Sequence, residues 1–242
     1  MENFSLPSFE QEIDYNEKLD GFISKNVITK EFDIVFMIDA TGSMGNWIKA
    51  AGDKCLKVSE DLRAQFPNLN FYFGGIFYRD PIDSKEDEHE IFDLTDDFLT
   101  LKNNFSKIIA KGGGDSPEDW VGAYSKVLNF NWRDGTKLII HIADSAAHTK
   151  EFCGEENHEE ENGKLPKILE SVAGKDIKIF SFAIQLKAKT SFEVCENYYK
   201  KYNGFYKIWS FDNVKSNTIT EQFEEIALAA AVCAAPKDII FI

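Results

Sequence analysis

Short apolar runs alternate along the chain with stretches in which apolar residues recur at helical spacing. The apolar runs predict six strands, over residues Glu31–Asp39, Asn70–Tyr78, His89–Leu94, Lys137–Ala143, Ile177–Ile184 and Phe205–Trp209. The helical spacing predicts six helices, over residues Met44–Phe66, Phe98–Ala110, 117–130, Pro166–Val172, Phe192–Tyr202 and Thr218–Ala234. This alternation is typical of an α/β fold with a Rossmann-like, open, mostly parallel central sheet and helices on both faces.

The remaining segments depart from this pattern. Residues 1–29 are polar with a few apolar anchors, which predicts an N-terminal lead that either wraps the domain or is partly mobile. Residues 30–242 are expected to form a single domain. The tail, Asp238–Ile242, is expected to add an edge strand or to pack on the sheet. Two acid-rich segments, Asp83–Glu90 and Glu155–Glu161, are expected to be solvated loops.

Composition disfavours several classes of partner. The chain has 242 residues, a formal net charge of −14 and a pI near 4.8. Nucleic acids and anionic membranes bind clustered Lys and Arg, so neither is expected as a partner. No stretch is long and apolar enough to span a bilayer, and the N-terminus lacks the features of a secretory signal. The four cysteines lie far apart without metal or redox spacing, which predicts free thiols and a cytoplasmic location.

Oxygen-bearing side chains gather where predicted strands end. Asp39 ends the first strand and is followed by Thr41 and Ser43, and Asp144 follows the fourth strand. A glycine-rich segment places Asp115 just before a predicted helix. In open α/β sheets, ligands bind beyond the carboxyl ends of the strands, so Asp39 and Asp144 would face one crevice if their strands are neighbours. Hard cations such as Mg²⁺ prefer these oxygen ligands, and a metal site is therefore predicted here.

Helix capping is the simpler alternative for each segment taken alone. Asp39, Thr41 and Ser43 would cap the helix expected from Met44, and Asp115 would cap the helix expected at residue 117. A cap of this kind stabilises a helix by about 1 kcal/mol. Capping does not explain why two similar apolar strands both end in an aspartate, or why two hydroxyls follow the first of them.

The segment Asp39-Ala-Thr-Gly-Ser-Met44 resembles the metal-ion-dependent adhesion site of von Willebrand factor type A domains, whose pattern is Asp-x-Ser/Thr-x-Ser. The resemblance covers roughly residues 30–215 and continues in order through Tyr78-Arg79-Asp80, Gly112–Asp119 and Ile142–Asp144. The glycine-rich segment and His141-Ile-Ala-Asp-x-x-x-His148 are most similar to the type A domains found beside α-kinase catalytic domains and in related protist proteins. A chain of 242 residues has no room for a kinase domain as well, so kinase activity and ATP binding are not expected.

The resemblance implies the type A fold and one bound Mg²⁺ ion, with Mn²⁺ or Ca²⁺ as alternatives. It implies that Thr41 and Ser43 supply hydroxyl oxygens, and that Asp39 and Asp144 act largely through bound waters. Asp115 stands where many adhesion-type members have a threonine. Three carboxylates would leave the ion with a formal charge of about −1, and so weaken its attraction for a carboxylate of a partner. A tightly held structural ion, or a different class of ligand, is therefore expected.

Three further residues near these motifs bear on the prediction. Glu118 is a weaker ligand candidate than Asp115, because acids in a first helical turn are already favoured by the helix dipole. His148 lies four residues past Asp144, and a hydrogen bond to a ligand carboxylate is favoured over direct metal binding or proton transfer. His141 lies within an apolar strand and is expected to be a core side chain.

These features favour a non-catalytic module that binds a protein partner, of unknown identity, around the ion. The alternative is a Mg²⁺-dependent phosphotransferase or phosphatase with Asp39 as the nucleophile, similar to haloacid dehalogenase phosphatases. Those enzymes usually carry a second aspartate two residues on, where this chain has Thr41. A scaffold with a vestigial ion is a third possibility. The sequence has no Gly-x-Ser-x-Gly, Gly-x-Gly-x-x-Gly or P-loop motif, and no enzymatic activity is expected.

Overall fold

The computed structural model describes residues 31–80, 89–114, 116–155, 157–210 and 218–234, which are built around one six-stranded sheet. Its strand order is β3-β2-β1-β4-β5-β6. The strands are β1 (Glu31–Asp39), β2 (Asn70–Tyr78), β3 (His89–Thr95), β4 (Thr136–Ala143), β5 (Ile177–Ala183) and β6 (Tyr206–Ser210). β3 is antiparallel to β2, and the other four pairings are parallel. The predicted mostly parallel α/β sheet is confirmed.

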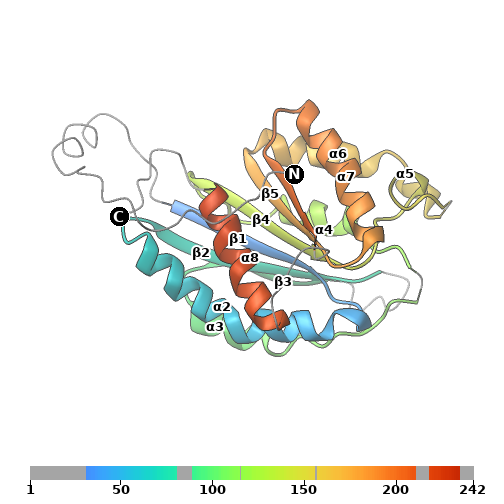
Figure 1. Cartoon of the computed structure of the whole chain (residues 1–242). Coiled ribbons are helices and arrows are strands. Elements are labelled where there is room, and N and C mark those ends of the chain that lie inside the picture. The colour runs from blue at the N-terminus through green and yellow to red at the C-terminus, as the bar shows by residue number, and fades with distance from the viewer. Residues whose placement is uncertain (1–30, 81–88, 115, 156, 211–217, 235–242) are drawn as a thin grey trace.

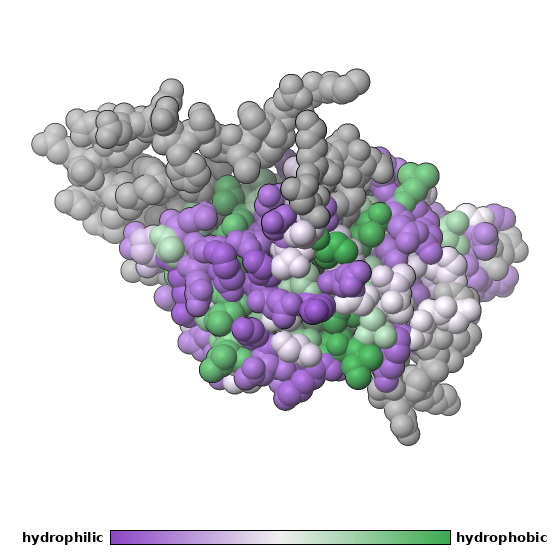
Figure 2. All heavy atoms as spheres, turned by 60° about the horizontal axis from the view of Figure 1, so that its bottom comes forward, coloured by the Kyte–Doolittle hydropathy of each residue, from purple (hydrophilic) through white to green (hydrophobic). Residues whose placement is uncertain are grey.

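Helices cover both faces of this sheet (Figure 1). One face carries α2 (Gly45–Gln65), α3 (Phe98–Phe105) and α8 (Ile219–Ala234). The other carries α4 (Trp120–Val127), α6 (Lys164–Gly174) and α7 (Leu186–Lys201). Three short elements lie in connections, namely η1 (Gly42–Met44), α5 (Lys150–Cys153) and η2 (Glu159–Glu161). The outer surface over α2 and α3 is mostly hydrophilic with scattered apolar residues, as expected of helices that bury only one side (Figure 2).

The central strand β1 is buried on both faces, which explains its nearly unbroken apolar sequence. Phe32, Ile34, Phe36 and Ile38 pack beneath α2, α3 and α8, whereas Val35 and Met37 pack on the opposite side. Burying each such side chain stabilises the fold by roughly 1.5–3 kcal/mol. The strand that carries Asp39 is therefore held rigidly from both sides.

A glycine pair in β2 lets neighbouring elements approach closely. A Cβ atom at Gly74 would lie 2.8 Å from the carbonyl oxygen of Phe92, and one at Gly75 would lie 2.5 Å from the ring of Phe105. The pairing register of β2 and β3 also shifts between Phe73 and Gly75. The two glycines thus mark a close contact rather than a weak point in the strand.

Two helices are shorter than the sequence pattern predicts, because tertiary hydrogen bonds take over their ends. α3 ends at Phe105 rather than at Ala110, since the following loop crosses to the end of β1, where the amide of Lys111 donates to the carbonyl of Ala40 (3.1 Å). α4 begins at Trp120 rather than at residue 117. The amide of Glu118 bonds the carbonyl of Ala146 (2.8 Å) instead.

Elsewhere the differences are small. α7 begins at Leu186 rather than at Phe192, because its first turns are largely polar and carry little apolar signal. The predicted free thiols are confirmed, since none of the four cysteines forms a disulfide. No helix in the described part of the chain has the length and apolar character needed to cross a membrane. The predicted N-terminal lead and the tail, Asp238–Ile242, lie outside the described residues.

The predicted core role of His141 is confirmed. The side chain is fully buried within β4, and its Nε2 and Nδ1 lie 2.8 Å and 3.1 Å from the hydroxyls of Tyr78 and Tyr124. The rings of Trp120 and Phe192 pack on it at centroid distances of 4.5 Å and 4.8 Å. Burial lowers the pKa of His141 well below its ordinary value, so the ring is neutral and both nitrogens serve the core.

Replacing His141 with phenylalanine is expected to lower the free energy of unfolding by about 2 kcal/mol, because the buried hydroxyl of Tyr78 would lose its partner. Urea unfolding followed by circular dichroism measures this change. A second substitution, Tyr78→Phe, should restore part of the loss by removing the stranded hydroxyl. A His141→Phe protein as stable as the wild type would contradict the role assigned to the histidine.

Candidate metal site at the carboxyl edge of the sheet

Asp39 and Asp144 leave the sheet from neighbouring strands. β1 and β4 pair in parallel with Ile38 opposite Ile142, so the residues that follow emerge side by side at the carboxyl edge. Both aspartates are buried, at 0% and 3% exposure. From the sequence, the two aspartates were expected to face one crevice only if their strands were neighbours. The strand order shows that β1 and β4 are neighbours.

One oxygen of Asp39 is fully used and the other is not. Oδ1 accepts hydrogen bonds from the amide and the hydroxyl of Thr41, at 2.9 Å and 2.7 Å. Oδ2 is buried and has no hydrogen-bond partner among the described residues. The pKa of Asp39 is raised to about 7, mainly because the carboxylate is buried. The hydrogen bonds from Thr41 lower this pKa, and the nearby Asp144 raises it further. A buried carboxylate oxygen without a donor is rare, and either a proton shared with Asp144 or a bound cation would satisfy it.

The two hydroxyls lie beside this carboxylate. Thr41 Oγ1 and Ser43 Oγ are 3.5 Å apart, and both residues line an open pocket. Neither η1 nor α2 receives a side-chain capping bond at its start, so capping does not account for these residues. Two carboxylates and two hydroxyls together are a donor set that suits a hard divalent cation.

The pocket is walled by three loops and by the start of α7. Its lining residues are Thr41, Gly42, Ser43, Gly112, Gly113, Gly114, Ser116, Glu118, Ser145 and Lys187. Glu118 is buried and forms part of the wall, although it precedes α4 instead of lying in its first turn. The cap of that helix is Asp119, which accepts a bond from the amide of Gly122. Asp115 lies outside the described residues, while both of its neighbours in sequence line the pocket.

Arg79 ties two of these loops together. The guanidinium is buried; its Nε donates to the carbonyl of Ala40 (3.2 Å), and its Nη2 donates to the carbonyl of Ile109 (2.8 Å) and to Glu90 (2.9 Å). The arginine therefore pairs with one acid and anchors two backbone carbonyls. Arg79 thus fixes the turn that follows Asp39 against the glycine-rich loop.

Two residues near the site carry no motif and were not predicted. Gln185 Nε2 donates to Asp144 Oδ2 (3.2 Å), and Lys187 Nζ donates to Ser116 Oγ (3.1 Å). Both follow β5, which lies next to β4 in the sheet. Only their position could have pointed to these two residues, because residues that follow a parallel strand next to β4 lie at the same edge of the sheet.

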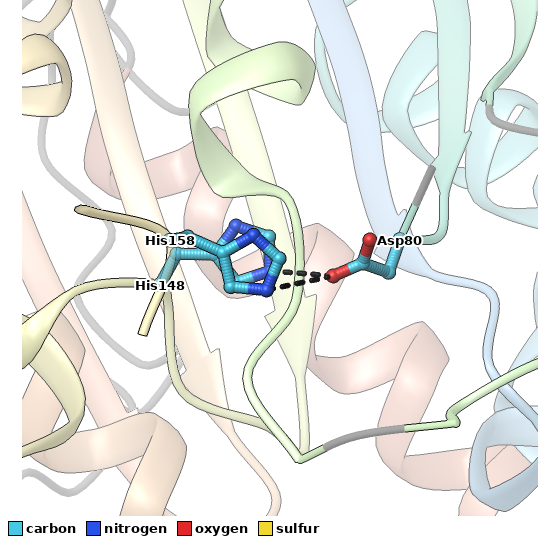
Figure 3. Close-up of side chains that lie close together, drawn as sticks. All are labelled: Asp80, His148 and His158. Atoms are coloured by element: carbon cyan, nitrogen blue, oxygen red, sulfur yellow. Dashed lines mark hydrogen bonds and ion pairs between the residues drawn. The ribbon is translucent and has the colours of Figure 1, made fainter. Parts of the chain in front are cut away.

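His148 belongs to a separate cluster at this edge (Figure 3). Its Nε2 lies 2.6 Å from Asp80 Oδ2, and its Nδ1 lies 3.0 Å from Glu161 Oε2. Burial lowers the pKa of His148, but its hydrogen bonds to Asp80 and Glu161, together with their charges, raise it overall to about 10. The ring of His158 stacks on that of His148 at 3.7 Å. The acid-rich segment expected to be solvated thus contributes two residues to a largely buried group.

No family model matches the chain. Among curated proteins, the chain is similar to the α-protein kinase vwkA of Dictyostelium discoideum, with 32% identity over 121 residues. The matched region is 50% of this chain and 19% of that protein. The matched region therefore spans only about a fifth of the length of that relative.

Solved structures give a broader likeness. The match to proximal thread matrix protein 1 from the mussel byssus covers 86% of this chain and 47% of the chain of that protein, with a TM-score of 0.55 and 12% identity. The match to the open conformation of the pilus adhesin SpaC of Lactobacillus rhamnosus GG covers 87% of this chain and 31% of the adhesin chain, with a TM-score of 0.56 and 12% identity. This chain shares their fold. At such identities the likeness concerns the arrangement of strands and helices alone.

Proposed function

We propose that this chain is a von Willebrand factor type A module that holds a Mg²⁺ ion at the carboxyl edge of its sheet and binds a protein partner around that ion. The observation that carries the proposal is the buried Oδ2 of Asp39, which has no hydrogen-bond partner among the described residues and lies beside a second carboxylate. A divalent cation is the ligand that this arrangement fits best.

The residues that would hold the ion are Asp39, Thr41, Ser43 and Asp144, with Asp115 added on the strength of the family resemblance. When bound, the ion supplies positive charge that stabilises the two buried carboxylates and a coordination position for an oxygen of the partner. Mn²⁺ and Ca²⁺ are alternatives with the same preference for oxygen. Glu118 would contribute from the pocket wall, whereas the bonds of His148 are directed to Asp80 and Glu161.

Features around the pocket support a protein as the ligand. The side chain of Ser43 is exposed. Two large apolar side chains are exposed at sequence positions close to residues of the site: Leu186 (72% exposed) precedes Lys187, and Ile109 (69% exposed) belongs to the loop that Arg79 anchors. Exposed apolar groups around a polar centre are typical of interaction surfaces. One of the similar structures is a pilus adhesin, and we extend a binding role to this chain as part of the proposal.

The burial of Asp39 disfavours the phosphatase alternative. A nucleophilic carboxylate must reach the phosphorus atom of its substrate, whereas Asp39 is 0% exposed and its Oδ1 already accepts two hydrogen bonds. The curated relative is named as an α-protein kinase, but the match covers only 19% of its length, and no kinase activity is proposed for this chain.

A magnesium titration followed by thermal unfolding tests the proposal. At a Mg²⁺ concentration about 100 times the dissociation constant, the ion should stabilise the fold by about 2.7 kcal/mol and raise Tm by roughly 5–10 °C. Asp144→Asn should abolish the shift. Asp53→Asn, which removes an exposed acid on α2, should leave it intact. An unchanged wild-type Tm in Mg²⁺, Mn²⁺ and Ca²⁺ would refute the metal site.

The same protein should be incubated with a generic phosphomonoester and Mg²⁺. No turnover is expected. Turnover that Asp39→Asn abolishes would replace the binding module with a phosphatase.

A further inference from the structure

We propose a second cation site at the same edge of the sheet, in which Asp80, His148 and His158 bind Zn²⁺. This site is distinct in its chemistry from the oxygen-rich pocket at Asp39 and does not depend on the function proposed above. It joins the end of β2 to the long connection between β4 and β5.

Three ligand atoms converge in this cluster, as Figure 3 shows. His148 Nε2 lies 2.6 Å from Asp80 Oδ2, and His158 Nε2 lies 3.7 Å from the same oxygen. One ligand atom from each of the three residues falls within 4.8 Å of the others. Asp80 and His148 are buried, at 2% exposure each, and His158 is half-buried. The atoms are therefore close enough to share one ion after small side-chain rotations.

The far side of the His148 imidazole is also built as in a metal site. His148 Nδ1 lies 3.0 Å from Glu161 Oε2, and His158 Nδ1 lies 3.6 Å from Glu160 Oε1. Histidines that bind metals usually donate their second N–H to a carboxylate, which fixes the tautomer and leaves the other nitrogen to the ion. Both histidines place Nε2 inward, but only His148 Nδ1 lies at hydrogen-bond distance from an acid, and the 3.6 Å between His158 Nδ1 and the exposed Glu160 is a longer charge contact.

The backbone is held in unusual conformations to bring the two rings together. Thr149 follows His148 with φ 75° and ψ 150°, a region that residues other than glycine rarely occupy, and His158 itself has φ 43°. The amide of Thr149 donates to Asn157 Oδ1 (2.7 Å), which fastens the segment after His148 to the residue before His158. Strain of this kind is typical of functional sites.

An ion pair alone explains the cluster poorly. A protonated His148 satisfies Asp80 and Glu161, yet His158 then stacks a second imidazole 3.7 Å away, with its Nε2 directed at the same carboxylate oxygen. A divalent cation would engage both Nε2 atoms and Asp80 at once. Two imidazoles and one carboxylate favour Zn²⁺ over Mg²⁺ or Ca²⁺, with water completing the coordination.

Competition between the metal-free full chain and a chromogenic chelator for Zn²⁺ tests this site, in the presence of millimolar Mg²⁺. We expect one tightly bound Zn²⁺ per chain. His158→Asn should weaken binding at least 100-fold, and Glu161→Gln should weaken it by about 10–100-fold. Glu159→Gln, which alters an exposed acid in the same loop, is the matched control and should leave the affinity unchanged.

Two further variants distinguish this site from the pocket at Asp39 and from zinc binding by a thiolate. Asp39→Asn should retain full Zn²⁺ affinity, because it removes a ligand of the other pocket only. Cys153→Ser should retain it as well, and the Co²⁺-substituted protein should show no thiolate charge-transfer band, since no cysteine is among the ligands. Circular dichroism checks that His158→Asn is folded. Absence of a tight Zn²⁺ equivalent, or equal affinity in a folded His158→Asn protein, would overturn the proposal.

Discussion

In metal-free buffer at pH 8, Asp39→Asn is expected to raise the free energy of unfolding by on the order of 4 kcal/mol. The wild-type aspartate must ionise at this pH inside the protein, with its Oδ2 buried and Asp144 close by. Asparagine is neutral and nearly isosteric. Its oxygen can accept the two bonds from Thr41, and its amide can donate toward Asp144.

The raised pKa of Asp39 determines how the stability of the wild type changes with pH. The pKa of Asp39 is raised from 3.8 to about 7 in the folded protein, mainly by burial. Below pH 3.8 the group is protonated whether the chain is folded or not, and it has no effect on stability. Between pH 3.8 and about 7 the unfolded chain releases the proton and the folded chain keeps it. Stability therefore falls as the pH rises through this window, and the gap between variant and wild type widens.

Chemical unfolding at pH 5 and at pH 8, with a chelator present, measures the stability difference between Asp39→Asn and the wild type and its change with pH. Adding Mg²⁺ at pH 8 should restore stability to the wild type and do nothing for Asp39→Asn, because only the carboxylate gains from the ion. Asp53→Asn serves as the control for loss of one negative charge at an exposed position. A variant that is less stable than the wild type in chelator at pH 8 would show that Asp39 is not destabilised by its surroundings.

Arg79→Met is expected to lower the free energy of unfolding by about 3 kcal/mol and to weaken Mg²⁺ binding by at least about tenfold. The substitution keeps much of the buried aliphatic volume. It removes the donors to the carbonyls of Ala40 and Ile109 and leaves Glu90 without this cation. The turn after Asp39 would then lose its tie to the glycine-rich loop, although no proposed ligand is altered.

Urea unfolding measures the stability change of Arg79→Met, and the Mg²⁺-dependent shift of Tm measures the affinity. Lys49→Met, which removes an exposed cation from α2, is the matched control and should change neither. If Arg79→Met lowers stability while Mg²⁺ affinity stays at the wild-type level, the arginine supports the fold but does not position the site.

The strands could be predicted closely because their signal is local. β1 and β2 have the bounds that the apolar runs predict, and β4 and β5 differ by one residue at one end. Sustained apolar runs that end in a polar residue leave little choice of boundary when both faces of the sheet are buried. Helix ends were harder to predict, because α3 and α4 are cut short by hydrogen bonds to residues distant in the sequence.

The candidate sites show the same division between local and distant information. Asp39, Thr41 and Ser43 lie in one short motif, and Asp144 follows a similar strand, so their proximity could be predicted once the strands were taken as neighbours. Gln185 and Lys187 carry no motif, and only the strand order places them at this edge. The pair of stacked histidines could not be predicted, because it depends on a left-handed residue within an acid-rich segment.

The pairing of β1 with β4 also constrains the order of events during folding. The two strands are separated by roughly 100 residues of sequence, and the intervening chain must be brought round before they can meet, which is entropically slow for parallel sheets. The carboxylates at their ends become neighbours only after that step. The proposed ion, which needs both of them, would arrive too late to guide the chain to its fold, and it would act by slowing unfolding of the finished structure.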